Sequence, residues 1–238
     1  MSKEDLKVSI IVPNNGRDIT LLRRSIDAST YRNTELIVID RGFERSAQRN
    51  IGIRESTGEC LLFLDSDQSV SPRLIAECVE LVKLGYAAIY IPEIIMVRSF
   101  FDRVRRFERE FYTGTAIDVP RFVVRHNCPE FCEFLTGPED ADWGNRLKGY
   151  KKVSKNWLYH HDHVTVWEYL KKKAYYTKSM KMYAKLWKND PVLNLKYRLI
   201  TVFTENGKWK KLLRHPVLTL GIIFILLIRG VIYLGLRS

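Results

Sequence analysis

Short apolar runs alternate with amphipathic segments through the first two thirds of this chain. The apolar runs occupy residues 8–12, 35–39, 60–64 and 87–91. They are too short for helices and too continuous for half-exposed strands, which favours buried strands of a parallel sheet. The segments at residues 19–28, 46–54 and 72–84 have helical spacing or helix-start residues. This alternation predicts an α/β fold with a mostly parallel sheet, doubly wound by helices.

Weaker signals follow in the middle of the chain. Residues 98–112 interleave arginines at 103, 105, 106 and 109 with four phenylalanines and predict a helix with one aromatic and one basic face. Packing on the domain surface is the simplest interpretation of this helix, and an acceptor or phosphate role is the alternative. Residues 118–125 predict a further strand, and residues 140–147 a short helix.

The last third of the chain has a different pattern. Residues 166–188 and 191–203 predict amphipathic helices rich in aromatic residues and lysine, as at a membrane interface. Residues 212–236 are apolar for long enough to cross about 30 Å of hydrocarbon. Arg229 would be costly inside a bilayer, so a buried hairpin helix or a dimer contact is the alternative. We therefore expect a domain over residues 1–165, interfacial helices over 166–211 and a transmembrane helix over 212–238.

Charge is concentrated in the same region. The chain has a formal net charge of +12, and residues 151–238 hold 18 Lys and Arg against 4 Asp and Glu. Basic residues next to a long apolar run favour an anionic membrane surface as partner, with no nucleic acid expected. Basic residues are denser before the apolar run, at 208–214, than after it, where Arg237 stands alone. The positive-inside rule therefore predicts a location at the cell membrane with the main domain facing the cytoplasm.

The cysteines and the N-terminal residues bear on the compartment of the main domain. The chain has four cysteines without the spacing of a disulfide framework or of metal-binding pairs. The apolar residues 8–12 are too few for the core of a signal peptide. Both observations fit a main domain exposed to the cytoplasm.

Polar residues follow the predicted strands where ligands bind in open α/β sheets. Pro13 and Asn15 follow the first strand, Asp40 follows the second, and the third ends in Asp65-Ser66-Asp67. Two carboxylates separated by one residue can share a hard divalent cation with a diphosphate. The structural alternative is a solvated turn, because Asp is common where strands end.

Two further groups are candidates for chemistry. Arg45 and Arg49 lie close to a predicted helix start, where a phosphate would be favoured, although surface arginines are common. Glu139, Asp140 and Asp142 also lie at a helix start, where acids stabilise the helix dipole. A carboxylate there could alternatively act as a general base. The histidines at 160, 161 and 163 follow a predicted last strand, and either metal ligation or packing would explain them.

Taken in order, five segments resemble the family-2 glycosyltransferases. They are Val-Ser-Ile-Ile-Val-Pro, Glu-Leu-Ile-Val-Ile-Asp, Ala-Gln-Arg-Asn-Ile-Gly, Thr-Gly-Glu-Cys-Leu-Leu-Phe-Leu-Asp-Ser-Asp and Gly-Pro-Glu-Asp-Ala-Asp-Trp. The resemblance covers residues 7–165. It implies a GT-A fold, a nucleotide-diphosphate sugar as donor, Mg²⁺ or Mn²⁺ as cofactor, and an inverting single displacement.

The resemblance also implies roles for individual residues. Asp140 would be the catalytic base. The other expected residues are, for the nucleotide sugar, Pro13, Asn15, Asp40, Arg49, Asp65, Ser66 and Asp67; for the metal, Asp65, Asp67 and His163; and for a possible acceptor site, Glu139, Asp142 and Trp143. Asp40 is followed by Arg-Gly-Phe where the family commonly has Asp-Gly-Ser. The Gln-x-x-Arg-Trp motif of processive synthases is absent, which argues against a long-polymer synthase.

The overall plan is similar to a reduced cellulose-synthase-like enzyme or a mannosyltransferase of lipid-linked oligosaccharide assembly. It implies transfer of mannose from GDP-mannose to a polyprenol- or dolichol-linked saccharide, as in N-glycan biosynthesis. One alternative is a UDP-sugar-dependent membrane transferase that makes a glycolipid or surface polysaccharide. Another is a non-catalytic module that binds a nucleotide sugar or nucleic acid. A homo-oligomer formed through the apolar helix would be compatible with each of these three functions.

Overall fold

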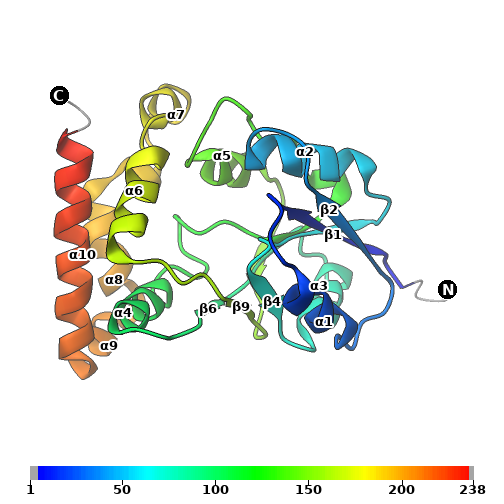
Figure 1. The fold of residues 1–238 in the computed structure, drawn as a ribbon, viewed down its shortest axis with the longest axis horizontal. Helices are drawn as coiled ribbons and strands as arrows, with labels where there is room; N and C mark the ends of the chain where they lie inside the picture. The colour runs from blue at the N-terminus through cyan, green and yellow to red at the C-terminus, as the bar shows by residue number, and fades with distance from the viewer. Residues whose placement is uncertain (1–4, 236–238) are drawn as a thin grey trace.

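The computed structural model describes residues 5–235, and the side chains of residues 5–230 (Figure 1). A six-stranded sheet has the order β2-β1-β3-β7-β5-β8, and a three-stranded sheet has the order β4-β9-β6. The strands are β1 (Val8–Pro13), β2 (Thr34–Ile39), β3 (Cys60–Phe63), β4 (Gln68–Val70), β5 (Ala88–Tyr90), β6 (Glu93–Ile95), β7 (Phe122–Val124), β8 (Lys151–Val153) and β9 (Leu158–His160).

Helices lie on both sides of the larger sheet, and those of the last third gather at one end of the molecule (Figure 1). The α-helices are α1 (Thr20–Asp27), α2 (Arg45–Glu55), α3 (Leu74–Lys83), α4 (Phe100–Arg109), α5 (Glu139–Arg146), α6 (Val166–Tyr176), α7 (Met180–Leu186), α8 (Val202–Thr204), α9 (Trp209–Arg214) and α10 (Pro216–Gly235). The short 3-10 and π-helical turns are η1 (Arg125–Asn127), η2 (Pro191–Leu193), η3 (Tyr197–Thr201) and η4 (Glu205–Gly207).

The larger sheet is mostly parallel, as the sequence predicted, with one reversed strand. β1 pairs in parallel with β2 and β3, and β5 pairs in parallel with β8. β7 lies between β3 and β5 and runs antiparallel to both. The prediction of a mostly parallel sheet is therefore confirmed, and the reversed direction of β7 is a feature that the sequence pattern did not predict.

The core explains why the predicted strands form. All residues of β1 and β3 are buried. Side chains from one face of these strands pack with α1 and α3, and those from the other face pack with Phe131 and Trp143. This two-sided burial is what a continuous apolar run indicates, and it fixes Asp65 just beyond the end of β3.

The helix expected over residues 166–188 is broken into α6 and α7. Between them, the Ser179 hydroxyl donates to the carbonyl of Thr136 at 2.7 Å and accepts from its N–H at 2.8 Å. Gly137, at a φ of 103°, lies so close that a Cβ there would be 2.4 Å from the Tyr176 carbonyl oxygen. These contacts connect the end of α6 to the loop before α5. The segment at 191–203, expected as one helix, forms η2, η3 and part of α8.

Helix α10 packs along α4 (Figure 1). A Cβ on Gly221 would lie 2.5 Å from Val104 Cγ2, so the two backbones approach closely. Arg229 donates to both carboxylate oxygens of Glu108, at 2.6 and 2.7 Å. This ion pair turns the Arg229 side chain toward α4. Such a contact is compatible with the alternative interpretation of the segment, a buried hairpin helix.

The predicted transmembrane helix is not supported. In the part of the chain that the structure describes, no helix is both long and apolar enough to span a membrane. Residues 236–238 of that prediction, including the flanking Arg237, lie outside the described residues.

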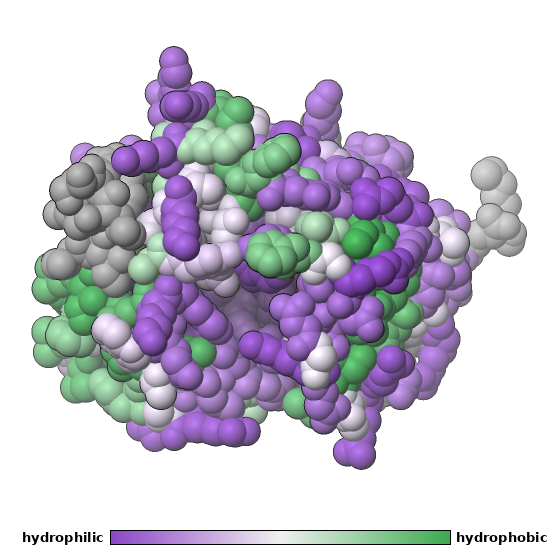
Figure 2. Space-filling view, turned by 45° about the horizontal axis from the view of Figure 1, so that its top comes forward, coloured by the Kyte–Doolittle hydropathy of each residue, from purple (hydrophilic) through white to green (hydrophobic). Residues whose placement is uncertain are grey.

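One side of α10 is exposed and apolar. Its exposed side chains recur at helical spacing, and they are Val217, Leu220, Ile223, Phe224 and Leu227. We call these five residues the α10 stripe. Figure 2 shows apolar residues gathered at the end of the molecule where α10 lies, beside a largely hydrophilic hollow near the middle of this face.

Candidate active site

Asp65 lies just beyond the end of β3 and is held by arginines. Its carboxylate oxygens lie 3.5 Å from Nη2 of Arg49 on α2 and 3.5 Å from Nη1 of Arg121 before β7. Burial alone would raise the pKa of Asp65, but Arg121, Arg49 and Arg45 lower it well below its usual range. Asp65 is therefore ionised and fixed in place.

Asp67 and His160 meet because the smaller sheet pairs β4 with β9. In its register Gln68 lies opposite His160, which brings Asp67 Oδ1 to 3.2 Å from His160 Nε2. The other ring nitrogen of His160 lies 2.7 Å from Glu93 Oε1 on β6. Burial alone would lower the pKa of His160, but its hydrogen bonds to Asp67 and Glu93 raise it to about 10. The positions of Asp67 and Glu93 on either side of the ring therefore favour the imidazolium form of His160.

Three residues could hold a divalent cation. One ligand atom each from Asp67, His160 and Asp162 lies within 4.8 Å of the others. Two carboxylates and an imidazole suit Mn²⁺, and oxygen-rich sites also suit Mg²⁺. Binding would require His160 to lose its proton and Asp67 to leave Arg17, which lies 3.0 Å away.

This cluster differs from the expected metal ligands Asp65, Asp67 and His163. Asp65 is occupied by two arginines. His163 lies beyond the end of β9, with Nδ1 3.6 Å from Asp102 Oδ2 in the first turn of α4. The structure therefore favours His160 over His163, because β9 pairs with β4 at His160.

Asp140 lies in the first turn of α5 and faces Asp65 across Arg49. Arg49 Nη1 donates to Asp140 Oδ1 at 2.5 Å, while its Nη2 lies near Asp65. The Asp140 side chain remains 40% exposed, whereas that of Arg49 is 5% exposed. One buried guanidinium thus joins the two acidic clusters, which are 75 residues apart in the sequence, and leaves one carboxylate accessible.

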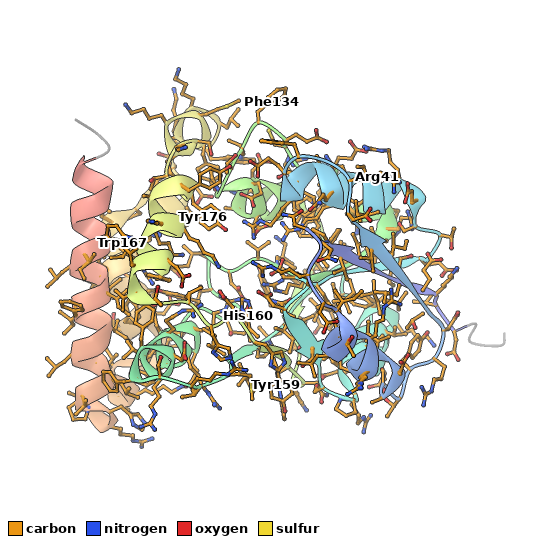
Figure 3. The ribbon with its side chains drawn as sticks, in the orientation of Figure 1. Arg41, Phe134, Tyr159, His160, Trp167 and Tyr176 are labelled. Carbon is orange, nitrogen blue, oxygen red and sulfur yellow. The ribbon has the colours of Figure 1, made fainter. Side chains whose placement is uncertain are left out.

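Asp140 opens onto a cavity of about 530 Å³ between the sheet and the C-terminal helices. Arg49, Arg121 and His160 line the same cavity. Figure 3 shows His160 beside this central space, between the strands and α6. An accessible carboxylate, two arginines and a candidate cation site next to one cavity could bind a diphosphate and accept a proton.

Part of the sequence matches a known protein family. The family model for glycosyl transferase family 2 matches residues 10–138, more than half of the chain. The chain belongs to glycosyl transferase family 2. No curated protein sequence matches it.

One solved structure has a fold similar to that of this chain, with a TM-score just above 0.5. TarS from S. aureus matches with a TM-score of 0.51 and 15% identity, over 74% of this chain and 40% of the TarS chain. A form of S. aureus TarS, residues 1–349, matches with a TM-score of 0.49 and 14% identity, over 98% of this chain and 91% of that chain. The same form in complex with UDP-GlcNAc has a TM-score of 0.47 and 14% identity, with 98% and 92% covered. The chain thus spans less than half of the longer TarS chain.

The remaining residues expected at the donor site of this family-2 domain lie along the sheet edge. Pro13 ends β1 and is buried, and Asp40 is exposed after β2. The Asn15 side-chain oxygen accepts from Gln48 Nε2 at 3.1 Å. Ser66 lies in the turn between β3 and β4 and is partly exposed. Asp65, Asp67 and Arg49 form the contacts described above.

The residues expected at an acceptor site make structural contacts. Glu139 is buried and accepts from Arg45 Nη2 at 3.1 Å. Burial and the charge of Asp140 raise the pKa of Glu139. Asp142 accepts from Arg146, and from the Trp187 indole N–H at 2.9 Å. Trp143 stacks on Phe131 in the core, and its indole N–H donates to a backbone carbonyl. Trp143 still contributes to the cavity wall, but Asp142 chiefly anchors α7 to α5.

Three site residues had no assigned role in the sequence interpretation. Arg121 stands within a predicted strand, Glu93 belongs to none of the five segments that resemble the family, and His160 carries the same signal as His161 and His163. A histidine directly ending a strand was the only available signal for His160. Arg121 and Glu93 contact each other at 3.2 Å, a pairing that only the folded sheet reveals.

Proposed function

We propose that this protein is an inverting glycosyltransferase that moves a sugar from a nucleotide diphosphate to a hydroxyl of a lipid-linked acceptor. Family membership supports the reaction class. The observation that carries the mechanism is the placement of Asp65 and Asp140 on the same guanidinium of Arg49, beside a shared cavity.

Asp140 is the base in this proposal. It takes the proton from the acceptor hydroxyl while that oxygen forms a bond to the anomeric carbon of the sugar. The bond between this carbon and the diphosphate oxygen breaks, and the nucleotide diphosphate leaves with the electron pair. Attack from the side opposite the leaving group inverts the configuration. Arg49 holds Asp140 in position, and the exposed side of its carboxylate faces the cavity.

The arginines and the cation site act on the leaving group. Arg49 and Arg121 lie next to Asp65, where the diphosphate of a donor bound at the sheet edge would arrive. A cation bound by Asp67, His160 and Asp162 would neutralise negative charge that develops on the diphosphate. Pro13, Asn15, Asp40 and Ser66 are proposed to hold the nucleoside and sugar, following their places along the same edge.

GDP-mannose is the proposed donor, and a dolichol- or polyprenol-linked saccharide of the N-glycan type the proposed acceptor, both from the resemblance alone. UDP-sugars that serve glycolipid or surface-polysaccharide synthesis are the competing donors. A screen of GDP-mannose, UDP-glucose and UDP-GlcNAc for nucleotide release, with Mn²⁺ and polyprenyl-linked saccharides in detergent, separates them. Binding of nucleotide without release would identify a non-catalytic binding module instead.

The α10 stripe supports association with the cytoplasmic face of the cell membrane. The stripe follows α9 in the sequence, and α9 carries exposed basic residues, including Lys210 and Arg214. An apolar helix face flanked by basic residues binds in the interface of anionic lipids without crossing the bilayer. Vesicles containing phosphatidylglycerol should therefore sediment the wild-type protein but not a variant with Leu220→Ser and Phe224→Ser. Equal sedimentation, or a dimer that forms through the stripe without lipid, would contradict this placement.

The direct test of function uses Asp140→Asn, with Asp27→Asn as control. Asp27 is exposed on α1, far along the sequence from the site. Asp140→Asn should lower nucleotide release by about 100-fold or more, the usual range for a general base. Asp27→Asn should leave it unchanged. Undiminished release by Asp140→Asn would remove this residue from the mechanism.

A further inference from the structure

The cavity extends beyond Asp140 into the C-terminal helices, and its far wall is basic. Arg105 and Arg109 from α4, Tyr169 and Lys173 from α6, Arg198 from η3 and Arg229 from α10 all line it. Helices from the last third of the chain therefore complete a cavity that begins in the family-2 domain. Figure 1 shows α6 between α10 and the sheet, in the position to form this wall.

Three cations surround one buried aromatic ring in this wall. Lys173 Nζ lies 5.3 Å from the centre of the Tyr169 ring, and the guanidinium carbons of Arg229 and Arg105 lie 5.2 and 5.6 Å from it. Tyr169 is only 7% exposed, and its hydroxyl has no hydrogen-bond partner among residues 5–230. A buried hydroxyl without a partner is costly, and this one belongs to a residue that lines the cavity.

The charges in this wall do not balance within the described residues. Arg229 pairs with Glu108, Arg105 lies 3.5 Å from Asp162, and Arg109 lies 3.1 Å from Asp118. Lys173 and Arg198 have no carboxylate within 4.0 Å in the same part of the chain. Burial lowers the pKa of Lys173, and Arg198, Arg105 and Arg109 lower it further, against the opposing effect of Glu108. Arg198 Nη1 donates to the carbonyl of Val192 at 3.3 Å, but neither Lys173 nor Arg198 has a carboxylate partner among the described residues, so two cations and the Tyr169 hydroxyl can contact an anionic ligand.

We propose that Lys173, Arg198 and the Tyr169 hydroxyl form an acceptor subsite that binds a phosphate group. This inference rests on the proposed function, because the same cavity reaches Asp140. An acceptor that occupies it would place its reacting hydroxyl near Asp140 and its phosphate against α6 and η3. The substrate class is therefore a phosphate-bearing acceptor. Phosphate offers several acceptor oxygens and up to two negative charges, which match two cations and a neutral donor.

Binding to the full-length protein tests the subsite without requiring turnover. Isothermal titration would use sn-glycerol 3-phosphate as a soluble probe and farnesyl phosphate in neutral detergent micelles as a lipid probe. Both titrations are performed with saturating GDP or UDP and Mn²⁺, so that phosphate does not enter the donor site. Glucuronate serves as a probe with a single carboxylate charge.

Lys173→Met should weaken binding of both phosphate probes by about tenfold or more, the usual effect of losing a charged hydrogen-bond partner. Tyr169→Phe should weaken it severalfold and keeps the ring that packs in the wall. Lys185→Met is the matched control, because Lys185 is exposed on α7 and should leave binding unchanged. Preference for the lipid probe would identify a lipid-linked phosphate, and equal binding a soluble one.

Unchanged phosphate binding by Lys173→Met and Tyr169→Phe would overturn the subsite, and so would glucuronate binding as tightly as phosphate in the wild type. If Lys173→Met does not fold, Tyr169→Phe and Arg198→Gln carry the same test. The two proposals fail separately. If phosphate binding depends on Lys173 but no nucleotide is released, the proposed transferase activity is wrong. If nucleotide is released but phosphate binding does not depend on Lys173, the proposed subsite is wrong.

Discussion

Removing the charge of Glu108 should show that α10 is part of the folded domain. Glu108 accepts from Arg229 at 2.6 and 2.7 Å and from the Tyr112 hydroxyl, and the side chains of Glu108 and Arg229 are 5% and 19% exposed. Burial alone would raise the pKa of Glu108, but Arg229 lowers it, so the pair is charged at neutral pH. Glu108→Gln leaves the Arg229 charge buried without a counterion. Losing one partner of such a pair costs ~3–5 kcal/mol.

The contacts of Glu108 allow a closer value for the stability that Glu108→Gln should remove. Gln can still accept one hydrogen bond from Arg229, so we expect a loss of about 3 kcal/mol. For a chain of this length, each kcal/mol lowers the melting temperature by ~2–4 °C, which gives a shift of about 6–12 °C. Replacing both Glu108 and Arg229 by leucine removes both charges, and its cost should be smaller than the sum of the costs of Glu108→Leu and Arg229→Leu by about 2 kcal/mol.

The assay is thermal unfolding followed by circular dichroism, for each single variant and the double variant. Glu110→Gln is the control, because its partner Lys211 forms an ion pair that is about 40% exposed on both sides. That pair should contribute less than ~1 kcal/mol. A coupling energy below ~0.5 kcal/mol between Glu108 and Arg229 would refute the assignment of α10 to the folded domain.

Three further outcomes follow from the structure. Asp67→Asn and His160→Asn should each weaken Mn²⁺ binding at least tenfold, as measured by calorimetry. Removing divalent cations with EDTA should reduce nucleotide binding. Nucleotide binding that does not depend on the metal would exclude this cation site. Gly221→Leu should destabilise the fold by ~1–3 kcal/mol through overpacking against Val104, with partial recovery in combination with Val104→Ala, and an unchanged melting temperature would contradict the close helix contact. Burial alone would raise the pKa of Glu35, but its hydrogen bonds lower it to about 2, so the stability it contributes is complete above pH ~4.5 and is lost as the pH falls toward 2. Glu35→Gln should flatten that part of the pH–stability curve, whereas an unaltered acid limb would contradict the shift.

Much of the domain could be predicted from its sequence, because burial on both faces leaves a clear signature. The apolar runs that became β1, β2, β3 and β5 were each placed within two residues of their observed ends. The direction of β7 could not be predicted in the same way. Its three residues carry no directional signal, and its antiparallel partner β3 lies far from it in the sequence.

The site was predictable in its acidic residues and not in their partners. Asp65 and Asp140 stand in recognisable segments, so the sequence indicated both. Their common contact is Arg49, whose role depends on α2 and α5 lying side by side. His160 differs from His163 only through the pairing of β9 with β4, which is a long-range contact that no local pattern encodes.

Arg229 explains why hydropathy gave the wrong expectation for the C-terminal helix. An apolar run with one arginine resembles a membrane span when each residue is considered alone. Its partner Glu108 lies 121 residues earlier in the sequence, so the compensating charge is visible only after folding. The same contact brings α10 into the wall of the cavity that Asp140 shares.

The most direct test of the central claim compares nucleotide release from the preferred donor by wild-type protein and by Asp140→Asn, with Mn²⁺ and a lipid-linked acceptor. The account predicts release by the wild type, a loss of about 100-fold or more in the variant, and equal donor binding by both. Release that is the same in both proteins would contradict a base at Asp140 and the mechanism built on it.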